Sequence, residues 1–504
     1  MTDSRGATLA VDAGTSLIKA VVFDERGREQ IVVRRTTTID SPRPGWAEQD
    51  MAEVLDVVWS CIADATRQYA RPIARVAITG QGDGAWMIGH DGKPVRPAVL
   101  WNDARATAVI DAWTRNGTLE DAFRVNGSLG NLGLPNAILA WFLAEEPAAL
   151  KGVRDVVTCG SWLFESLTGA RGLHPSEASA PWLDVATGQY SDELFALYGL
   201  DSVRELIPPV FSEAELTRPL QPEAAKRAGL DVGIPVTLAP YDVVATATGG
   251  GSVAVGSAFC ILGTTLCTGT LVDTVSTDAT PTGLTLHGSE GRLITRAFPT
   301  LSGTGVIEWA RELLGVEDAA ALTELARGSE PGAHGVRMWP YLSPAGERMP
   351  FLDADARGVI GGITFGTGRA DIARATLEGL AHVIRDCLDT SGAHVTELVL
   401  SGGGSASDLW CQVIADVTGV ETVRIAGTQV GAKGAMLYAA VAADEYQDLH
   451  AAAEALVQRA ETFIPSLSTR GLFDERHADF LQTRDALMHR WNRWDRGLER
   501  PSYD

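Results

Sequence analysis

Residues 7–24, ATLAVDAGTSLIKAVVFD, contain two apolar runs separated by a short turn of small and polar residues. Thr8–Val11 and Ile18–Asp24 have the β-branched and apolar content of strands, and Asp12-Ala-Gly-Thr-Ser lies between them. A glycine-containing turn that joins two such runs is typical of a β-hairpin. The sequence therefore predicts a strand, a tight turn and a second strand.

The turn of this hairpin carries groups that suit a phosphate. Gly14 allows the backbone to approach a ligand closely, and the hydroxyls of Thr15 and Ser16 can donate hydrogen bonds. Asp12 can hold Mg²⁺ directly or through water. We interpret the turn as part of a nucleotide site, with an ordinary structural turn as the alternative.

A second apolar run followed by a Gly-Thr turn occurs in the other half of the chain. Ala258–Leu262 has the pattern of a strand and leads into Gly263-Thr264-Thr265. Strand patterns alternate with helical ones, such as Asp50–Tyr69, which favours an α/β architecture. We predict two related domains, residues 1–248 and 249–504, that each contribute one phosphate loop.

The composition and charge narrow the classes of partner. The chain of 504 residues is 45% hydrophobic and 21% charged, which is typical of globular domains. Its net charge of −22, without a compensating run of Lys or Arg, argues against nucleic acid as a partner. The most apolar stretch, Gly249–Gly269, is interrupted by polar residues, so we expect no membrane span. The six cysteines form no CxxC pair, and Met1–Gly6 is polar and unlike a signal peptide, so we expect a cytoplasmic protein.

The main candidate for a catalytic group is Asp242. It follows the apolar run Pro235–Ala239, at the end of a predicted strand, where α/β proteins place their chemistry. A carboxylate in this position can accept the proton of an attacking hydroxyl during phosphoryl transfer. The alternative is an N-cap for a helix over Val243–Thr248.

Two polar clusters in the first half suit a polyhydroxylated ligand. They are Gly80-Gln81-Gly82-Asp83-Gly84-Ala85-Trp86 and Trp101-Asn102-Asp103-Ala104-Arg105. Carboxylates can accept hydroxyl protons, and tryptophan can cover the C–H faces of a sugar. The alternatives are turn formation by Asp83 and a salt bridge between Asp103 and Arg105. The chain has no GxxxxGK[ST] loop, so a nucleotide would need the two Gly-Thr turns instead.

Taken in order, these motifs resemble the FGGY family of carbohydrate kinases, which includes glycerol kinase and xylulokinase. The resemblance extends from Leu9 to about Ala443. The matching features are Asp12-x-Gly14-Thr15-Ser16, Gly80-Gln81, Trp101-x-Asp103-x-Arg105, Tyr241-Asp242, Gly263-Thr264-Thr265, Ser302-Gly303-Thr304-Gly305, Pro340-Tyr341-Leu342-Ser343, Arg357-Gly358 to Glu378-Gly379, Ser401-Gly402-Gly403-Gly404-Ser405 and Gly431-Ala432-Lys433-Gly434-Ala435. Their shared order and spacing, rather than any single motif, make the resemblance specific.

The resemblance implies a fold, a reaction and a set of roles. The fold would be two actin/hexokinase-like (ribonuclease H-like) α/β domains with the active site in the cleft between them. The reaction would use ATP and Mg²⁺ to phosphorylate a small sugar or polyol, with domain closure excluding water. Dimers are common in this family, so a homodimer is an expectation. The residues that match the family's functional positions are Asp242 as the catalytic base, Asp12 for Mg²⁺, Thr15, Ser16, Gly263 and Thr264 for the phosphates, Thr304, Gly402, Gly403 and Ser407 for the nucleotide, and Gln81, Gly82, Asp83, Trp101 and Asp103 for the acceptor.

Departures from the family pattern bear on the acceptor. Glycerol kinases have Arg-Glu, and many xylulokinases have Met-His, where this chain has Gly82-Asp83. Typical xylulokinases also have Asn after the catalytic Asp, where this chain has Val243. This combination looks closer to the erythritol kinase and L-xylulose kinase branch. We therefore expect an open-chain acceptor of four or five carbons, held chiefly by Gln81, Asp83, Asp103 and Asp242.

Three other functions are compatible with parts of the pattern. A D-xylulokinase, or a kinase for another ketose or pentitol, would use the same site. An actin-like or chaperone-like nucleotide switch would have no need of Asp242 or of the cluster Trp101–Arg105. A pseudoenzyme that binds sugar without transfer would not need intact Asp12, Thr15, Asp242 and Thr264.

Overall fold

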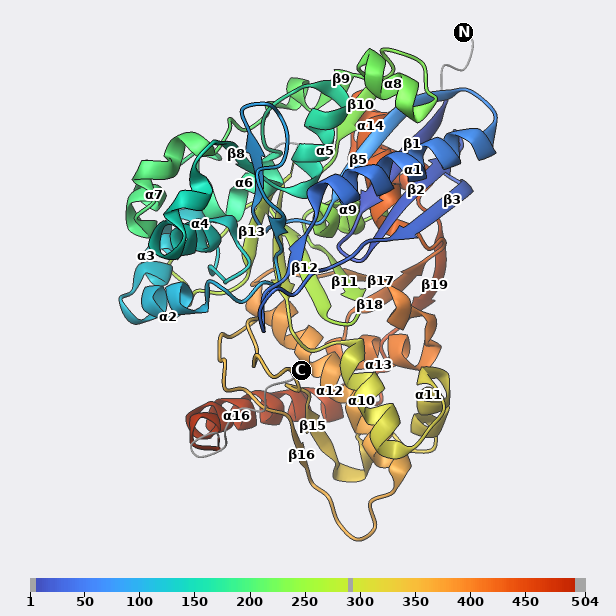
Figure 1. Ribbon diagram of the computed structural model, residues 1–504. Helices are drawn as coiled ribbons and strands as arrows, with labels where there is room; N and C mark the ends of the chain where they lie inside the picture. The colour runs from blue at the N-terminus through green and yellow to red at the C-terminus, as the bar shows by residue number, and fades with distance from the viewer. Residues whose placement is uncertain (1–5, 289–292, 495–504) are drawn as a thin grey trace. The chain divides into compact units, whose positions relative to one another are not determined.

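The hairpin predicted over residues 7–24 is present at the centre of a mixed sheet (Figure 1). In the computed structural model, which describes residues 6–288 and 293–494, β1 (Ala7–Ala13) pairs antiparallel with β2 (Leu17–Phe23). The register of this pair places Asp12 directly opposite Lys19. All residues of β1 are buried, as expected of a central strand that helices cover on both faces.

The parallel strands of this sheet create a common carboxyl edge. The sheet has the order β3-β2-β1-β5-β10-β9, and β5 (Ile73–Gly80) and β10 (Pro235–Leu238) run parallel to β1. Antiparallel strands β3 (Glu29–Thr36) and β9 (Thr217–Pro219) form its edges. Ligands of α/β proteins bind outside the carboxyl ends of parallel strands. The polar residues that follow these three strands therefore meet at one edge.

Helices cover both faces of the first sheet. On one face, α1 (Met51–Tyr69) begins after Asp50, whose carboxylate accepts hydrogen bonds from the backbone of Ala52 and Glu53 and so acts as N-cap. The opposite face packs against α14 (Val430–Ala442) and α15 (Leu449–Leu456), which come from a distant part of the sequence (Figure 1). The helix predicted over 50–69 is thus present, with Asp50 as its cap.

Two glycines let α14 pack closely on α9 (Asp242–Gly249). A Cβ at Gly249 would lie 1.9 Å from the carbonyl oxygen of Val430, and a Cβ at Gly434 would lie 1.8 Å from that of Ala245. No side chain fits at either position unless the helices separate. The contact fixes the start of α9, and with it the position of Asp242.

The second half of the chain repeats the same strand pattern. There β11 (Ser257–Leu262) and β12 (Leu266–Val272) form an antiparallel hairpin around the second Gly-Thr turn. Strands β17 (Glu397–Ser401) and β18 (Glu421–Ile425) continue parallel from β11, and β19 (Arg459–Phe463) is antiparallel to β18. The strand order β12-β11-β17-β18-β19 matches β2-β1-β5-β10-β9 in pairing type. This confirms the prediction of two related α/β domains of the actin/hexokinase type.

The remaining elements extend or surround these two sheets. Up to residue 288 they are β4 (Glu48–Gln49), β6 (Trp86–Gly89), β7 (Ala98–Val99), β8 (Val153–Val157), β13 (Leu284–His287), α2 (Thr107–Arg115), α3 (Thr118–Asn126), α4 (Pro135–Glu145), α5 (Cys159–Thr168), α6 (Pro175–Trp182), α7 (Asp192–Tyr198) and α8 (Pro222–Ala228). From residue 293 onward they are β14 (Ile294–Pro299), β15 (Arg337–Trp339), β16 (Val359–Gly361), α10 (Thr304–Leu314), α11 (Ala319–Arg327), α12 (Arg369–Thr390), α13 (Asp408–Thr418) and α16 (Arg470–Trp494).

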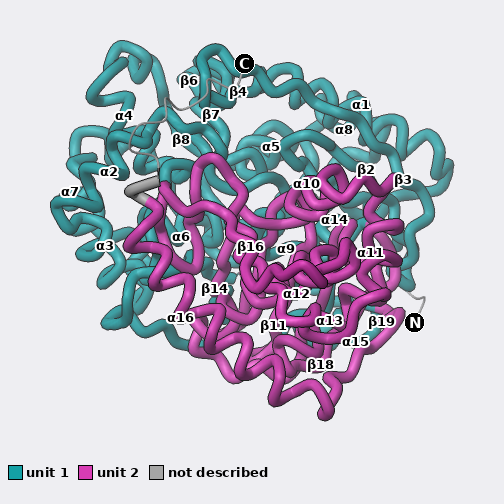
Figure 2. Tube along the Cα trace, turned by 90° about the horizontal axis from the view of Figure 1, so that it is seen from below, with its two compact units in different colours: residues 1–253, 273–295, 429–457 teal, residues 254–272, 296–428, 458–504 magenta. Residues whose placement is uncertain are grey.

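Two compact units divide the chain in a discontinuous way (Figure 2). Unit 1 comprises residues 1–253, 273–295 and 429–457, and unit 2 comprises residues 254–272, 296–428 and 458–504. The segment 429–457 belongs to unit 1 because α14 and α15 pack against the first sheet, and the segment 273–295 belongs to it because β13 contacts α6. The units therefore divide the chain differently from the predicted boundary at 248/249, which stays a prediction about the two sequence repeats.

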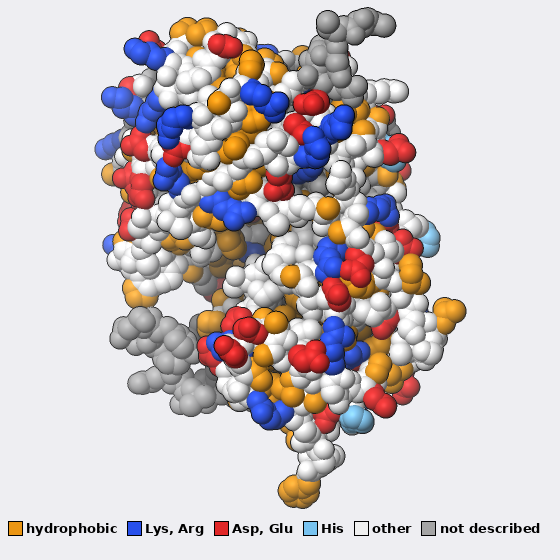
Figure 3. All heavy atoms as spheres, turned by 90° about the vertical axis from the view of Figure 1, so that its right-hand side faces the viewer, with side chains coloured by type: hydrophobic (Ala, Val, Ile, Leu, Met, Phe, Trp, Pro, Cys, Tyr) orange, Lys and Arg blue, Asp and Glu red, His pale blue; other side chains and the backbone are white. Residues whose placement is uncertain are grey.

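Some expectations from composition can be compared with the described residues. Within residues 6–288 and 293–494, no helix is long and apolar enough to cross a membrane. All six cysteines are free and buried. On the face drawn in Figure 3, basic side chains are interspersed with acidic ones. Residues 1–5, which bear on the expected lack of a signal peptide, lie outside the described residues, and the cytoplasmic location stays a prediction.

The contact between α9 and α14 leads to a stability prediction. Replacing Gly434→Ala should lower the free energy of unfolding by about 2–4 kcal/mol, because the methyl group overlaps a backbone carbonyl that cannot move independently. The measurement is thermal and denaturant unfolding followed by circular dichroism. Gly471→Ala is the matched control, because a Cβ at this helical position has no atom within 4 Å. Its stability should change by less than about 1 kcal/mol. Wild-type stability in the Gly434 variant would contradict the packing argument.

Candidate active site

Three carboxylates of unit 1 gather at the carboxyl edge of the first sheet. Asp12 lies near the end of β1, Asp83 lies in the turn after β5, and Asp242 is the first residue of α9 after β10. Asp12 is buried and pairs with the Nζ atom of Lys19 at 3.1 Å. Tyr241, rather than Asp242, occupies the N-cap position of α9. The N-cap alternative for Asp242 is thus not what the structure shows.

The environment of Asp242 changes its acidity strongly. Although the residue retains some exposed surface, loss of solvent, followed by the negative charge of Asp12, raises the pKa of its carboxyl to about 7. A hydrogen bond from the backbone of Val243 acts in the opposite direction, the charge of Asp83 raises the pKa further, and the cation of Lys19 lowers it. A carboxylate with a pKa near neutrality is suited to exchange protons at physiological pH.

The segment that precedes Asp242 is held from two sides. The hydroxyl of Thr79 donates to the carbonyl oxygen of Pro240 at 2.7 Å, which ties the ends of β5 and β10 together. A Cβ at Gly82 would lie 2.3 Å from the Cδ2 atom of Tyr241, so only glycine fits beneath this ring. Gly82, predicted to contact the acceptor, therefore makes room for Tyr241. The next residue, Asp83, has a φ of 59°, a left-handed conformation that Asp tolerates in tight turns.

Three residues predicted to contact ligands form hydrogen bonds with one another. The Nε1 atom of Trp101 donates to Oγ1 of Thr15 at 3.0 Å, and the Thr15 hydroxyl donates to Oε1 of Gln81 at 2.8 Å. Gln81 is buried, and its Nε2 atom donates to Oε1 of Gln49 at 2.8 Å. The structure thus brings these residues together as one hydrogen-bonded layer. Ser16, in contrast, is exposed at the tip of the turn.

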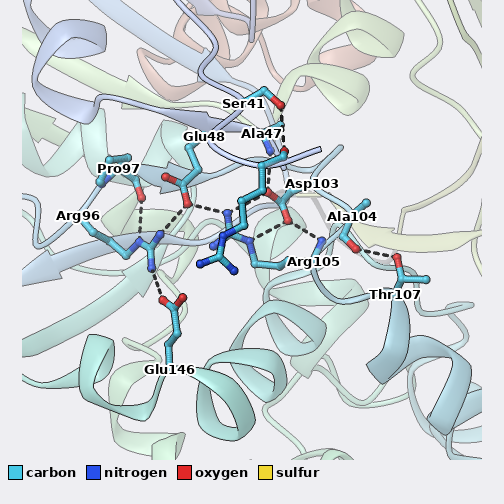
Figure 4. A network of polar contacts seen from close by, with 11 residues as sticks. Ser41, Ala47, Glu48, Arg96, Pro97, Asp103, Ala104, Arg105, Thr107 and Glu146 are labelled. Atoms are coloured by element: carbon cyan, nitrogen blue, oxygen red, sulfur yellow. Dashed lines mark hydrogen bonds and ion pairs between the residues drawn. The ribbon is translucent and has the colours of Figure 1, made fainter. Parts of the chain in front are cut away.

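Asp103 and Arg105 form the salt bridge that was the alternative to a ligand contact (Figure 4). One oxygen of Asp103 accepts from Nε and the backbone N–H of Arg105, both at 2.8 Å, and the other accepts from the backbone N–H of Ala47 at 2.7 Å. Arg105 also donates to Glu48 at 2.6 Å and lies 3.9 Å from the ring centroid of Trp46. Both Asp103 and Arg105 have fully buried side chains. Their role in this geometry is to hold the strand and turn segments that carry the site.

Unit 2 contains a cavity of about 660 Å³. Five of the residues predicted to contact the nucleotide lie on its wall, namely Gly263, Thr264, Thr304, Gly403 and Ser407. This volume is within the range of roughly 300–1,000 Å³ that is usual for small-molecule sites. The structure therefore brings two separate sequence motifs of unit 2, the Gly-Thr turn and the Gly-rich turn, to one concave surface.

The wall of this cavity suits an anionic nucleotide. Thr304 is the first residue of α10, and Ser407 caps α13 by accepting from the backbone of Trp410 at 3.2 Å. Helix N-termini favour negative charge, and phosphates commonly bind there. At Gly403, a Cβ would have no atom within 4 Å, so the backbone is open to a ligand. Gly402, with a φ of 85°, needs glycine for its backbone conformation.

Two groups of site residues were not predicted from the sequence. Lys19 is paired with Asp12. The sequence could have predicted this pair, because a hairpin that turns at Gly14–Ser16 places positions 12 and 19 opposite each other. In unit 2, α11 contributes Thr323 and Arg327 to the cavity wall. This helix lies outside every motif described above, so the sequence did not predict that it contributes to the cavity.

Unit 1 offers one carboxylate, Asp12, that could take part in binding a nucleotide-associated Mg²⁺. Within the described part of the chain, no group of three His, Cys, Asp or Glu residues forms a metal site. Mg²⁺ in phosphoryl-transfer enzymes is usually held by one or two carboxylates, with substrate phosphates and water as the other ligands. Asp12 supplies one such carboxylate, and Gly431 leaves space beside it, because a Cβ there would lie 3.1 Å from its Oδ2 atom.

Three comparisons, with family models, with the sequences of known proteins and with solved structures, each found proteins similar to this chain. The N-terminal domain of the FGGY family of carbohydrate kinases matches residues 7–249, and its C-terminal domain matches residues 258–443. An erythritol kinase from Brucella abortus is 31% identical over 464 residues, which cover 87% of this chain and 88% of that protein. A xylulose kinase from Escherichia coli is 29% identical over 466 residues, covering 88% and 91%. A ligand-bound xylulose kinase from Lactobacillus acidophilus superimposes with a TM-score of 0.91 at 21% identity, over 97% of this chain and 100% of that one, and shows the shared fold.

The electrostatics of Asp242 lead to a prediction about stability and pH. In the folded protein its pKa is raised to about 7, so the folded state holds this proton more tightly than the unfolded state does. The resulting stabilisation is complete below the ordinary pKa of 3.8 and is lost as pH rises through about 7. Asp242→Asn avoids this loss, and at about pH 8 it should raise the free energy of unfolding by about 1–3 kcal/mol.

The control for this prediction is an aspartate with the opposite environment. Asp155 is buried and accepts hydrogen bonds from Arg154 and Arg171. Asp155→Asn should therefore lower stability at the same pH, because it weakens both ion pairs. Both variants are compared with wild type by denaturant unfolding between about pH 5 and pH 8. A stability difference for Asp242→Asn that does not grow with pH would contradict the assignment.

Proposed function

Because this chain belongs to the FGGY family of carbohydrate kinases, we propose that it transfers the terminal phosphoryl group of ATP to a hydroxyl of an open-chain sugar or polyol with four or five carbons. The observation that most supports this reaction is Asp242, a carboxylate with a pKa of about 7 at the carboxyl edge of the first sheet. The names of the relatives, erythritol kinase and xylulose kinase, support an acceptor of this class.

In the proposed mechanism, unit 1 binds the acceptor and supplies the base. Asp242 accepts the proton of the attacking hydroxyl, and its raised pKa makes it a stronger base than an ordinary carboxylate. Asp83, in its left-handed turn, presents a second carboxylate that accepts a hydrogen bond from another hydroxyl of the acceptor. The ring of Trp101, whose N–H is bonded to Thr15, contacts the acceptor through its face rather than through its nitrogen.

Unit 2 binds the nucleotide in this proposal. Its Gly-rich turn and the first residues of α10 and α13 hold phosphate oxygens through backbone N–H groups. Asp12 would hold Mg²⁺ on the acceptor side, with its orientation maintained by Lys19 at 3.1 Å. When bound with ATP, Mg²⁺ neutralises negative charge on the transferring group.

A D-xylulokinase, or a kinase for another ketose or pentitol, is the second candidate. The relatives named xylulose kinase favour it, since one is 29% identical over 88% of this chain. A nucleotide switch without acceptor is less well supported, because it gives no reason for a desolvated base and a tryptophan beside the first phosphate turn. The cytoplasmic location and a homodimer are further parts of the proposal that remain to be measured.

The test of the proposed function is a coupled ADP-release assay with Mg·ATP. The panel comprises glycerol, erythritol, D- and L-xylulose, D- and L-ribulose, ribitol, xylitol and arabinitol, with gluconate as an acidic control. We expect the highest kcat/KM with erythritol or L-xylulose, because Asp83 offers one carboxylate to the hydroxyls of a short open chain. A preference for D-xylulose would retain the kinase and overturn the acceptor class of this branch. No activity with any acceptor would contradict the proposal.

The acidity of Asp242 predicts the pH profile of the reaction. For wild type at saturating Mg·ATP, kcat/KM for the acceptor should rise about tenfold per pH unit below pH 7 and level off above it, because only the carboxylate form is a base. Asp242→Asn should lower kcat by about three orders of magnitude or more with little change in ATP affinity. Near-normal turnover of this variant would contradict the assignment.

Asp83→Asn provides a finer measurement of the same arrangement. It removes a negative charge that raises the pKa of Asp242, so the acid limb of the profile should move to lower pH. It should also raise KM for the acceptor more than KM for ATP. An acid limb that stays in place, or an effect confined to ATP, would show that Asp83 does not face the acceptor beside Asp242.

A further inference from the structure

Gln49 is a fully buried amide that lies behind the first phosphate turn and was not among the predicted site residues. Its Nε2 atom donates to the carbonyl oxygen of Thr15 at 2.7 Å, to Oγ1 of Thr37 at 3.1 Å and to the carbonyl oxygen of Thr38 at 3.3 Å. Its Oε1 atom accepts from Nε2 of Gln81 at 2.8 Å. Both ends of the amide are therefore bonded to residues in or next to the proposed active site.

The direction of every hydrogen bond in this chain of residues is determined by its two ends. Backbone carbonyl oxygens can only accept, so the NH₂ group of Gln49 must face Thr15 and Thr38, and its oxygen must accept from Gln81. At the other end, the indole of Trp101 can only donate, so Oγ1 of Thr15 accepts from it and the Thr15 hydroxyl donates to Gln81. Both ends require the same orientation of the two glutamine amides.

This pattern of donors and acceptors connects the phosphate turn, residues 12–16, to the acceptor wall, by which we mean the side chains of Gln81 and Trp101. The hydroxyl proton of Thr15 is directed at Gln81, and the backbone of the turn is held by Gln49 and by Thr37, whose hydroxyl donates to the Thr15 carbonyl at 2.6 Å. The ring of Trp101 is attached to the same hydroxyl oxygen. A change in the orientation of Gln49 would therefore displace both the turn and the ring.

We propose that Gln49 is a positioning residue for phosphoryl transfer, which holds Gln81, Thr15 and Trp101 so that the phosphate turn and the acceptor wall keep one geometry. This inference rests on the proposed function, since it assigns the turn to phosphate and Trp101 to the acceptor. Misplacement of reacting groups by about 1 Å costs on the order of 100-fold in rate. The predicted consequence of losing Gln49 is thus slower transfer and poorer coupling of ATP use to transfer, rather than loss of nucleotide binding.

The first test compares two buried amides. Gln49→Leu should lower kcat by about 10- to 100-fold and raise acceptor-independent ATP hydrolysis relative to transfer, with KM for ATP nearly unchanged. Asn126→Leu is the matched control: this amide is also buried, and it bonds to Ala180, Tyr198 and Ser128, none of which belongs to the site. The control should lower the melting temperature and leave kcat and the coupling ratio at wild-type values.

The second test uses protonation to restore the hydrogen-bond pattern. In Gln49→Glu, a protonated carboxyl group has one donor and one acceptor and can reproduce the bonds to Thr15 and Gln81, whereas the carboxylate cannot donate. Three oxygen acceptors and burial favour the neutral form of this group. The ratio of kcat for the variant to kcat for wild type should therefore increase as pH falls from about 9 to 6. The ratio removes the pH dependence that Asp242 gives to both proteins.

The third test asks whether Gln49 acts through Trp101. Trp101→Phe keeps the aromatic face and removes the donor to Thr15. If the two residues act through one hydrogen-bonded chain, the double variant with Gln49→Leu should be about as slow as the slower single variant, whereas independent effects would multiply.

The outcomes separate this proposal from the proposed function. Wild-type kcat and coupling in folded Gln49→Leu, a pH-independent ratio for Gln49→Glu, or multiplicative effects in the double variant would each overturn the role of Gln49 while the kinase reaction stands. Loss of activity in Asn126→Leu equal to that in Gln49→Leu would overturn it as well, because the effect would then follow stability. A wild-type enzyme silent with every acceptor would overturn both.

Discussion

The loss of solvent at Asp242, which stands beside the charge of Asp12, is the physical constraint on which the proposed site of unit 1 depends. Loss of solvent and the nearby charge of Asp12 raise the pKa of Asp242, and the two carboxylates lie close together because one lies near the end of β1 and the other follows β10 of the same sheet. Lys19 partly compensates for Asp12, and the start of α9 places the backbone N–H of Val243 at Asp242. Because the close approach of these carboxylates is unfavourable, the carboxyl edge of the first sheet must be held in place by rigid packing of the neighbouring helices.

The packing that provides this rigidity depends on small residues and on internal polar networks. Gly249 and Gly434 allow α9 and α14 to approach until their backbones touch, so the position of Asp242 is determined by a helix from the far end of the sequence. Asp103 and Arg105 form a fully buried ion pair on another side of the site. Breaking such a pair by removing one partner is costly, whereas intact it holds segments in register. A polar motif such as Trp101–Arg105 therefore stabilises the fold as well as providing candidate ligand contacts.

Each unit contributes different chemistry to the proposed reaction. Unit 1 concentrates carboxylates, which suit hydroxyl groups and Mg²⁺, and unit 2 concentrates glycine turns and helix N-termini, which suit phosphates. Both arise from the same strand order, in which a hairpin with a Gly-Thr turn is followed by parallel strands. The difference lies in the groups at the carboxyl ends of those strands: charged side chains in unit 1, and backbone N–H groups in unit 2. An acidic chain can in this way bind an anionic nucleotide without a cluster of lysines.

The sequence by itself determined the fold class, the two hairpins with their Gly-Thr turns, the helix after Asp50, and the position of Asp242 at the end of a strand. These features depend on local patterns, because strand and helix periodicity and turn residues act over a few neighbouring positions. The hairpin register even contained the pairing of Asp12 with Lys19. Only the tertiary structure decided which of these polar side chains bond to distant groups of the protein. Gln81 and Asp103 were equally good candidates in the sequence, yet their partners Gln49 and Ala47 lie far away along the chain. A side chain's direction depends on which distant groups bury it, and no local pattern records that.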